Sequence, residues 1–294
     1  GHTIPNRGVG IRLCQLLTKM DRGALYDAGE IFLALADNEL LDQLSLIPDE
    51  EDATLSSTAF SGSMVQRIST SAGDILVGGR GPNSYSLEAL DDVAAVIDLG
   101  GNDVYDNGTT GPRRRIMIVI DLAGDDRYQA TRPGVQGGAI MGASLLIDRK
   151  GNDVYDAKDV AQGSSLGGIG ILIDQSGSDH YVGVKRVQGQ ALGGVGLLVD
   201  RAGQDAYRAA LWAQGLGNPL GFGCLEDAAG DDTFFLGGLY VDSYDETPGY
   251  DGWGQGVGAG IRQSANGGIG VMLDGGGDDT YEFDYMGHGG GYWL

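Results

Sequence analysis

The chain has 294 residues, 54 of which are glycine, and its formal net charge at pH 7 is −22. Glycine this abundant without a Gly-x-y triplet excludes collagen and indicates a folded protein with many tight turns. Such an acidic chain disfavours binding to nucleic acid and favours divalent cations or cationic partners. No apolar run approaches the ~20 residues of a membrane span, so we expect no span.

Residues 8–46 are predicted to be helical. Apolar residues recur there at helical spacing, Asp21 is suited to be the N-cap of a second helix, and a third short helix is expected from Asn38 to Leu44. An acidic linker follows, so we assign residues 1–57 to one N-terminal unit. These helices could form a small domain or bind a partner. We favour a cap that covers the open edge of the repeat array that follows.

Residues 58–294 form that array, which repeats the motif Asp-x-x-Gly-x-Asp-x-Tyr. A degenerate copy at Gly78–Tyr85 has Asn83 in place of the second Asp, and one full copy ends in Phe234. The second Asp of successive full copies are 23, 27, 26, 26, 27 and 47 residues apart, a period typical of a solenoid. The first Asp of the copies are Asp98, Asp121, Asp148, Asp174, Asp200, Asp227 and Asp274. The second are Asp103, Asp126, Asp153, Asp179, Asp205, Asp232 and Asp279.

Each repeat has room for three short strands. Gly168–Ile173 alternates like a strand with one buried face, a second strand is expected at Tyr181, and a third before the next Gln-Gly pair. Three strands and three corners fit 26 residues at ~3.3 Å per strand residue. The sequence therefore predicts a mainly β protein, a parallel β-helix of about eight coils with a period near 26 residues.

Two further residue types recur once in each coil. The Tyr of the motif is expected to form a stacked aromatic column, and the Gln a ladder of amide hydrogen bonds between coils. Residues that repeat in every coil serve turning and stacking, whereas an active site would occur once. The Gln positions, each followed by Gly, are Gln136, Gln162, Gln188, Gln214 and Gln255.

The stacked motifs would form two columns of carboxylates, ~4.8 Å apart from coil to coil. Neighbouring carboxylates at that spacing repel by roughly 3 kcal/mol at an effective dielectric constant of 20. Two arrangements could offset the repulsion. Each Asp could accept N–H groups of its own turn, as in an Asx turn, or calcium could bridge the columns through carboxylate and backbone oxygens. We favour the turn and keep calcium as the alternative.

The corner resembles a known calcium motif. Gly151–Tyr155 is similar to the second half of the RTX nonapeptide, Gly-Gly-x-Gly-x-Asp-x-apolar, and Gly78–Tyr85 has its full length. The other copies carry Asp where RTX has its first Gly, and RTX coils hold two nonapeptides where these coils hold one motif. The resemblance covers the corner and implies calcium at the fourteen Asp. The whole array resembles bacterial Gly- and Asp-rich β-solenoid repeat proteins.

An insertion at 236–266 interrupts the array, and insertions in solenoids often form the binding face. Aromatic side chains beside carboxylates suit sugar rings. Alternatively, the loop only packs its aromatics on the coils. The candidate ligand-binding residues are Tyr240, Tyr244, Tyr250, Trp253, Trp212, Tyr292 and Trp293. The candidate catalytic residues are Asp245, Asp251 and His288, and His288 lies at a Gln position of the array.

These patterns predict a secreted, periplasmic or cell-surface scaffold that binds an extended ligand, either a glycan or a protein partner. The alternative is a polysaccharide-degrading enzyme, a lyase or glycoside hydrolase, with its site at the insertion near His288. After the last motif the sequence runs partway into another coil. We therefore expect further C-terminal coils, or another chain, to cover the open end.

Overall fold

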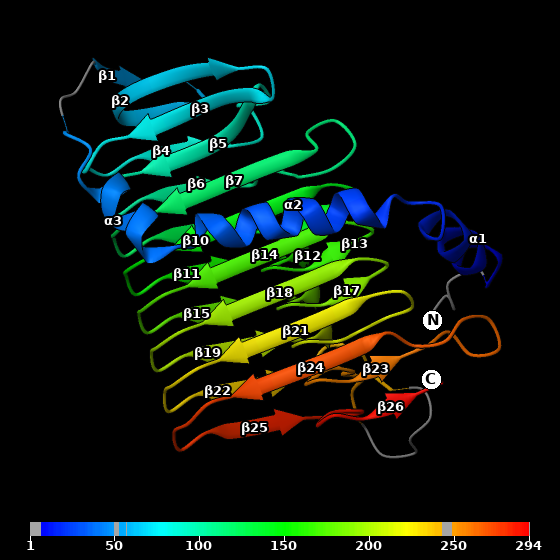
Figure 1. The fold of residues 1–294 in the computed structure, drawn as a ribbon. Helices are drawn as coiled ribbons and strands as arrows, with labels where there is room; N and C mark the ends of the chain where they lie inside the picture. The colour runs from blue at the N-terminus through cyan, green and yellow to red at the C-terminus, as the bar shows by residue number, and fades with distance from the viewer. Residues whose placement is uncertain (1–6, 50–52, 57, 243–248, 294) are drawn as a thin grey trace.

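The computed structural model describes residues 7–49, 53–56, 58–242 and 249–293. They form a parallel β-solenoid, an elongated stack of coils with three helices along one flank (Figure 1). The helices are α1 (Arg7–Leu17), α2 (Arg22–Leu35) and α3 (Asn38–Ser45). The predicted fold class is confirmed. None of the described helices has the length and apolar character needed to cross a bilayer.

Two strands of each coil belong to one large sheet, and they flank the corner motif. The long strands before the corner are β3 (Gly73–Gly78), β5 (Val93–Asp98), β7 (Ile116–Asp121), β10 (Ala143–Asp148), β14 (Ile169–Asp174), β18 (Val195–Asp200), β21 (Phe222–Asp227) and β24 (Ile269–Asp274). The short strands after it are β4 (Ser84–Ser86), β6 (Val104–Asp106), β8 (Arg127–Gln129), β11 (Val154–Asp156), β15 (His180–Val182), β19 (Ala206–Ala209), β22 (Thr233–Leu236) and β25 (Thr280–Phe283).

Two smaller sheets complete the regular coils. One contains β12 (Asp159–Ala161), β16 (Lys185–Val187) and β20 (Leu211–Ala213), and the other contains β9 (Ala139–Ile140), β13 (Ser165–Leu166) and β17 (Ala191–Leu192). Pairing is parallel and in register, so Asp148 lies opposite both Asp121 and Asp174. The predicted column of equivalent Asp residues is therefore confirmed.

The number of regular coils is smaller than predicted. From Asp98 to Asp227 five successive steps measure 23 to 27 residues, whereas the step to Asp274 is 47 residues. The coil that begins with β3 is shorter and has no strand in the smaller sheets. Eight corners stack, but about five turns keep the period near 26 residues, because the corner motif recurs whatever length of chain lies between two corners.

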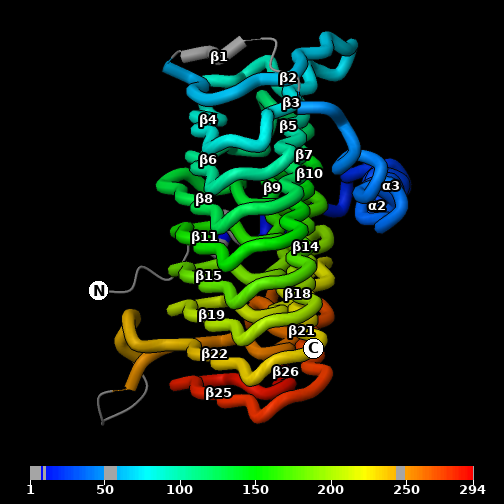
Figure 2. The backbone as a smooth tube through the Cα atoms, turned by 90° about the vertical axis from the view of Figure 1, so that its left-hand side faces the viewer, coloured from blue at the N-terminus to red at the C-terminus, as the bar shows by residue number. Residues whose placement is uncertain are grey.

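The helices cover a flank of the stack and not its end, which corrects the predicted cap. The helix α2 lies along β10 and β14 on the outside of the stack (Figures 1 and 2). Phe32 and Leu41 belong to one buried cluster with outward-facing residues of these strands, including Leu145 and Ile171. Every residue of β10 and β14 is buried, so these strands have two covered faces where one was expected. The open N-terminal edge is instead covered by β2 (Phe60–Thr70), which pairs antiparallel with β3, and β1 (Ala53–Ser56) pairs antiparallel with β2.

The predicted insertion at 236–266 consists of two loops with a piece of coil between them. The first loop has an antiparallel bridge between Val241 and Tyr250, and residues 243–248 within it lie outside the described residues. The chain then rejoins the stack, where Gly254 pairs with Ala213 and β23 (Gly258–Ala259) pairs with β26 (Gly291–Tyr292). A bridge between Ile261 and Ala265 closes the second loop.

Candidate metal centre

The first Asp of each motif ends a long strand and forms an Asx turn. In the copies from Asp98 to Asp200, its Oδ1 accepts the backbone N–H two residues later at 2.9–3.2 Å. Its Oδ2 accepts the Tyr hydroxyl of the preceding coil, as in Tyr128–Asp148 and Tyr155–Asp174, both at 2.7 Å. The hydrogen-bonded turn favoured from the sequence is thus present, and the Tyr adds a bond between coils.

The Tyr rings form the predicted aromatic column. From Tyr85 to Tyr281 the ring centroids of neighbouring coils are 4.6–5.0 Å apart, and the ring planes lie within 7° of parallel. Phe234 continues the stack without a hydroxyl. Each ring therefore supports the interior, while each hydroxyl fixes the carboxylate of the following coil.

The second Asp of each motif has one oxygen bonded and one oxygen without a partner. Its Oδ1 accepts the backbone N–H of the second Asp in the preceding coil at 2.5–2.9 Å, as in Asp126–Asp153 and Asp153–Asp179. Its Oδ2 has no hydrogen-bond partner in six consecutive coils, and these side chains are at most 2% exposed. The six residues are Asp103, Asp126, Asp153, Asp179, Asp205 and Asp232.

The two columns come together in overlapping groups of three. In each group the second Asp of one coil, the first Asp of that coil and the first Asp of the next coil bring oxygens within 4.8 Å of one another. Asp148, Asp153 and Asp174 form the central group. Five such groups follow one another along the described part of the stack, from Asp98 to Asp227.

Burial and mutual repulsion make it costly for these carboxylates to carry charge. Burial, with the Asp98 carboxylate beside it, raises the pKa of Asp103 to about 9. Burial, with the Asp174 carboxylate beside it, raises the pKa of Asp179 to about 10, and burial raises the pKa of Asp153 to about 7. At neutral pH each coil therefore needs a positive partner, and that partner is either a proton or a metal cation.

The donor set fits a hard cation. Calcium takes 6–8 oxygen ligands, usually with several carboxylates. Each group offers one oxygen from each of three carboxylates, and the Oδ2 of the second Asp has no hydrogen-bond partner, so the remaining ligands would be backbone oxygens or water. The corner also leaves no room for larger residues, since a Cβ on Gly151 would lie 1.7 Å from the carbonyl oxygen of Gly124.

No protein-family model, curated protein or solved structure matches this chain. Its site is therefore interpreted from its own geometry. The resemblance to the RTX nonapeptide is limited to the corner motif.

The Gln column differs from the predicted ladder of side-chain amides. Gln162 Nε2 donates to the carbonyl oxygen of Tyr155 at 2.9 Å and to that of Val182, in the next coil, at 3.0 Å. Gln136, Gln162, Gln188 and Gln214 each clamp two coils in this way, whereas Gln255 donates to Glu282 O at 3.4 Å. All five have a left-handed φ of 52–56°. His288 has φ 55°, and the N–H of the following Gly donates to Gln255 O at 2.9 Å, which confirms that His288 lies at a Gln position.

Only some of the predicted ligand-binding aromatic residues lie close to one another. Trp212 and Trp253 pack on a small apolar cluster, and the Trp253 ring forms T-shaped pairs with Tyr292 and Tyr285, with ring centroids 5.0 and 5.7 Å apart. The sequence places Tyr285 close to His288, but Tyr285 is not among the candidate ligand-binding residues. Tyr240 and Tyr250 lie at the base of the first loop, and Trp293 is exposed. Tyr244 and Asp245 lie outside the described residues.

Of the candidate catalytic residues that the structure describes, His288 and Asp251 do not line the same pocket. His288 packs against Phe283 and Tyr281, with ring centroids 4.5 and 5.7 Å away, and lines an open pocket at the end of the stack. The carboxylate in that pocket is Asp274, the first Asp of the last motif, and not Asp251. The backbone N–H of Asp251 donates to Tyr240 O at 2.6 Å, at the base of the loop.

Proposed function

We propose that this protein is a β-solenoid scaffold whose Asp columns bind calcium, and that it acts in a secreted, periplasmic or cell-surface setting. The observation that carries the proposal is the row of six buried Oδ2 atoms without a hydrogen-bond partner. A buried oxygen that carries charge and lacks a partner is costly, and a cation that binds it removes this cost.

The central group illustrates how the residues would act. Asp148, Asp153 and Asp174 would hold the ion, and the Asx turn and the Tyr hydroxyl keep the two outer carboxylates oriented. The ion would neutralise charge between two coils and so link them. Neighbouring groups share an Asp, and two dications ~4.8 Å apart repel by roughly 14 kcal/mol at an effective dielectric constant of 20. We therefore expect alternate groups to be filled, about three of the five.

Melting experiments test the proposal. Calcium is expected to raise the Tm of the wild-type protein, and EGTA to lower it, by mass action on the folded state. Asp153→Asn keeps a side-chain oxygen that accepts the N–H of Asp126 but replaces the unpartnered Oδ2 by an NH2 group. This variant should melt higher than wild type in EGTA, because a buried charge is gone, and gain less from calcium.

Asp125→Asn is the matched control, because this residue is an exposed neighbour in the same corner whose Oδ1 accepts the N–H of Asn152. Its calcium response should equal that of wild type. Equal responses from Asp125→Asn and Asp153→Asn would show that calcium acts through general charge screening, and the proposed site would then be wrong.

The ligand of the scaffold is proposed to be a glycan, and the support is the aromatic group around Trp253. Rings that present edges and faces beside a loop suit the apolar faces of sugars. A glycan array with Trp253→Ala tests this, with Tyr26→Ala as control because Tyr26 is an exposed aromatic on α2, away from the group. Loss of binding in Trp253→Ala alone supports the glycan, and binding that survives in both variants contradicts it.

A further inference from the structure

The N-terminal end of the Asp columns is closed by a residue that departs from the motif. Asn83 stands where the other copies have Asp, and its Oδ1 accepts the N–H of Ser63 in β2 at 2.8 Å. Its Nδ2 donates to Asp98 Oδ2 at 2.8 Å. Phe60 of β2 covers the Tyr85 ring at 5.1 Å. A neutral amide and an antiparallel strand thus end both the carboxylate column and the aromatic column.

The opposite end carries the same groups without such a closure. Within the stack, the N–H of each second Asp donates to a carboxylate of the next coil, and among the described residues no coil lies beyond Asp279 to supply one. Internal Tyr hydroxyls donate to the next coil, whereas that of Tyr281 turns back to Asp274 of its own coil. β24 and β25 pair on one side only, with β21 and β22.

Interior residues of the last coil are therefore uncovered. Tyr281 is 38% exposed, whereas the seven aromatic residues that precede it in the column are at most 2% exposed. Phe283 and Met272 also lie at this end, which contains an open pocket lined by Met272, Asp274, Tyr281 and His288. Met272 pairs in register with Leu225, a residue of the buried interior, so it lies where the next coil would continue the core.

We propose that this end binds a partner segment that carries the same corner motif, which adds as a further coil in parallel register. The end presents a backbone N–H where every internal coil meets a carboxylate, a Tyr ring where every internal coil meets a ring, and two unpaired strand edges. A segment with Asp-x-x-Gly-x-Asp-x-Tyr meets all three demands at once, because it does so in every internal coil. Addition of a strand to an exposed sheet edge is an established mode of recognition.

A second copy of this chain fits the end less well. Its own N-terminal coil is covered by β2, where Phe60 is buried, so a head-to-tail contact would first require this strand to leave. A tail-to-tail contact would bring the two Asp279 N–H groups together, while the Oδ1 of each Asp279 already accepts the N–H of Asp232. The occupant we propose is therefore a segment with the corner motif whose leading coil is open.

A peptide of one coil tests the proposal on the whole protein. The probe is a fluorescein-labelled synthetic peptide with the sequence of residues 169–194, which contains Asp174, Gly177, Asp179 and Tyr181. Fluorescence anisotropy measures its binding. We expect saturable binding, and affinity at least about tenfold lower for a peptide with Asp174→Ala and Asp179→Ala, since each lost charge-assisted hydrogen bond costs more than about 1.4 kcal/mol.

Two neighbouring residues of β24 provide matched variants of the protein. Met272→Lys places a charge on the open interior and should weaken peptide binding by about tenfold or more. Leu273→Lys changes the next residue, which pairs with Glu226 on the outer face, and should leave binding within about twofold.

Absence of binding by the unmodified peptide at about 1 mM, the upper limit for a recognisable site, would overturn the proposal. A larger loss in Leu273→Lys than in Met272→Lys would overturn it in favour of the outer face. A dimer in light scattering that Met272→Lys abolishes would identify a second copy as the occupant, and the partner segment would then be wrong. The comparison of the two peptides uses wild-type protein, so it tests the proposal even if Met272→Lys lowers the Tm of the protein.

Discussion

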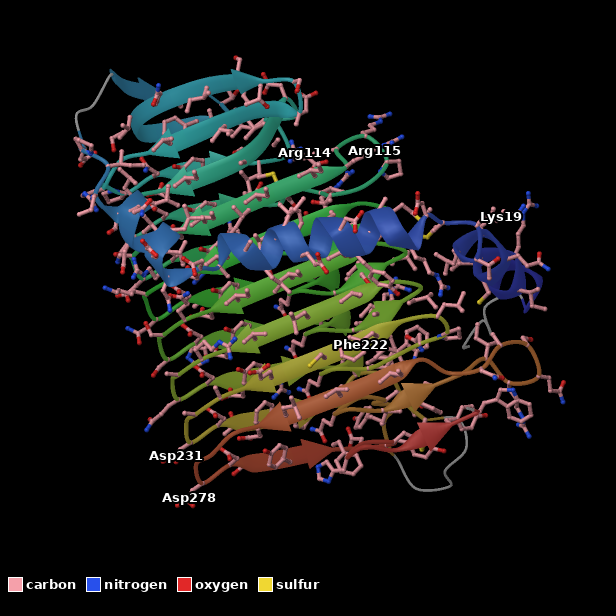
Figure 3. All side chains as sticks on the ribbon, viewed as in Figure 1. Lys19, Arg114, Arg115, Phe222, Asp231 and Asp278 are labelled. Carbon is pink, nitrogen blue, oxygen red and sulfur yellow. The ribbon has the colours of Figure 1, made fainter. Side chains whose placement is uncertain are left out.

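At the scale of single residues, the corner motif divides its bonds among carboxylate oxygens, a hydroxyl and backbone N–H groups. The Oδ2 of the second Asp lacks a hydrogen-bond partner in six consecutive coils, and in one coil the Oδ1 of the first Asp, Asp227, lacks one as well. At the surface, the residues just before the second Asp of each motif form a third column. In it Asp231 and Asp278 lie one above the other (Figure 3). There Asp231 Oδ1 accepts the N–H of Asp278 at 2.9 Å, and solvent screens the charges.

Removal of one Tyr hydroxyl tests the link between coils. Tyr155→Phe keeps the ring in the stack but leaves Asp174 Oδ2 without its donor. We expect a loss of about 1–3 kcal/mol in the free energy of unfolding, measured by urea denaturation in EGTA. Phe234 shows that the stack accepts this ring, so a loss above that range would indicate a packing defect, and no loss would contradict a structural role for the hydroxyl.

The raised pKa values predict how stability depends on pH in the metal-free protein. Asp103, Asp153 and Asp179 have pKa values of about 9, 7 and 10 in the folded state, above the ordinary value near 3.9 of the unfolded chain. The folded state then binds more protons than the unfolded state between about pH 4 and these values. Its stability is therefore full below pH 4 and falls as pH rises through 7 to 10.

We accordingly expect the Tm in EGTA to be higher at pH 5 than at pH 8, and calcium to reduce this difference by displacing the protons. Differential scanning calorimetry at both pH values, with and without calcium, measures it. A metal-free protein that melts higher at pH 8 than at pH 5 would show that the columns are not proton-stabilised.

At the scale of elements, the long strands depend on the helices that cover them. Phe32 of α2 is 4% exposed against the outer face, whereas its neighbour Ile31 is 63% exposed. Phe32→Ala should lower the free energy of unfolding by about 3–5 kcal/mol through lost burial and a cavity. Ile31→Ala should stay within about 0.5 kcal/mol of wild type. Similar effects of the two changes in urea denaturation would show that α2 does not pack as described.

The elements also show what sequence patterns can and cannot predict. The repeated spacing from Asp98 to Asp279 predicted the stack and its columns, because local turn chemistry recurs in every coil. The position of α2 was not predicted. In Ile169–Asp174 the glycine at 170 makes a strand buried on both faces look like an alternating one. The sequence also could not predict that the Oδ2 of Asp153 lacks a hydrogen-bond partner, because this depends on which carboxylate oxygen accepts the N–H of Asp126.

At the scale of the whole molecule, the stack is a one-dimensional array with two different ends. Each coil contacts mainly its neighbours, so stability is a sum of coil and interface terms. Charge in the columns weakens every interface, and a cation between two coils strengthens the interfaces it touches. At one end Asn83 closes the columns, and at the other Asp274 and Asp279 leave them open.

The most direct test of the account is the number of calcium ions bound per chain. Protein dialysed against calcium is analysed by inductively coupled plasma mass spectrometry, beside Asp153→Asn and Asp125→Asn. We expect about three ions per chain, since repulsion prevents neighbouring groups among the five from filling together. We expect fewer ions in Asp153→Asn and an unchanged number in Asp125→Asn. Wild-type protein without bound calcium, or equal loss in both variants, would contradict calcium binding by the Asp columns.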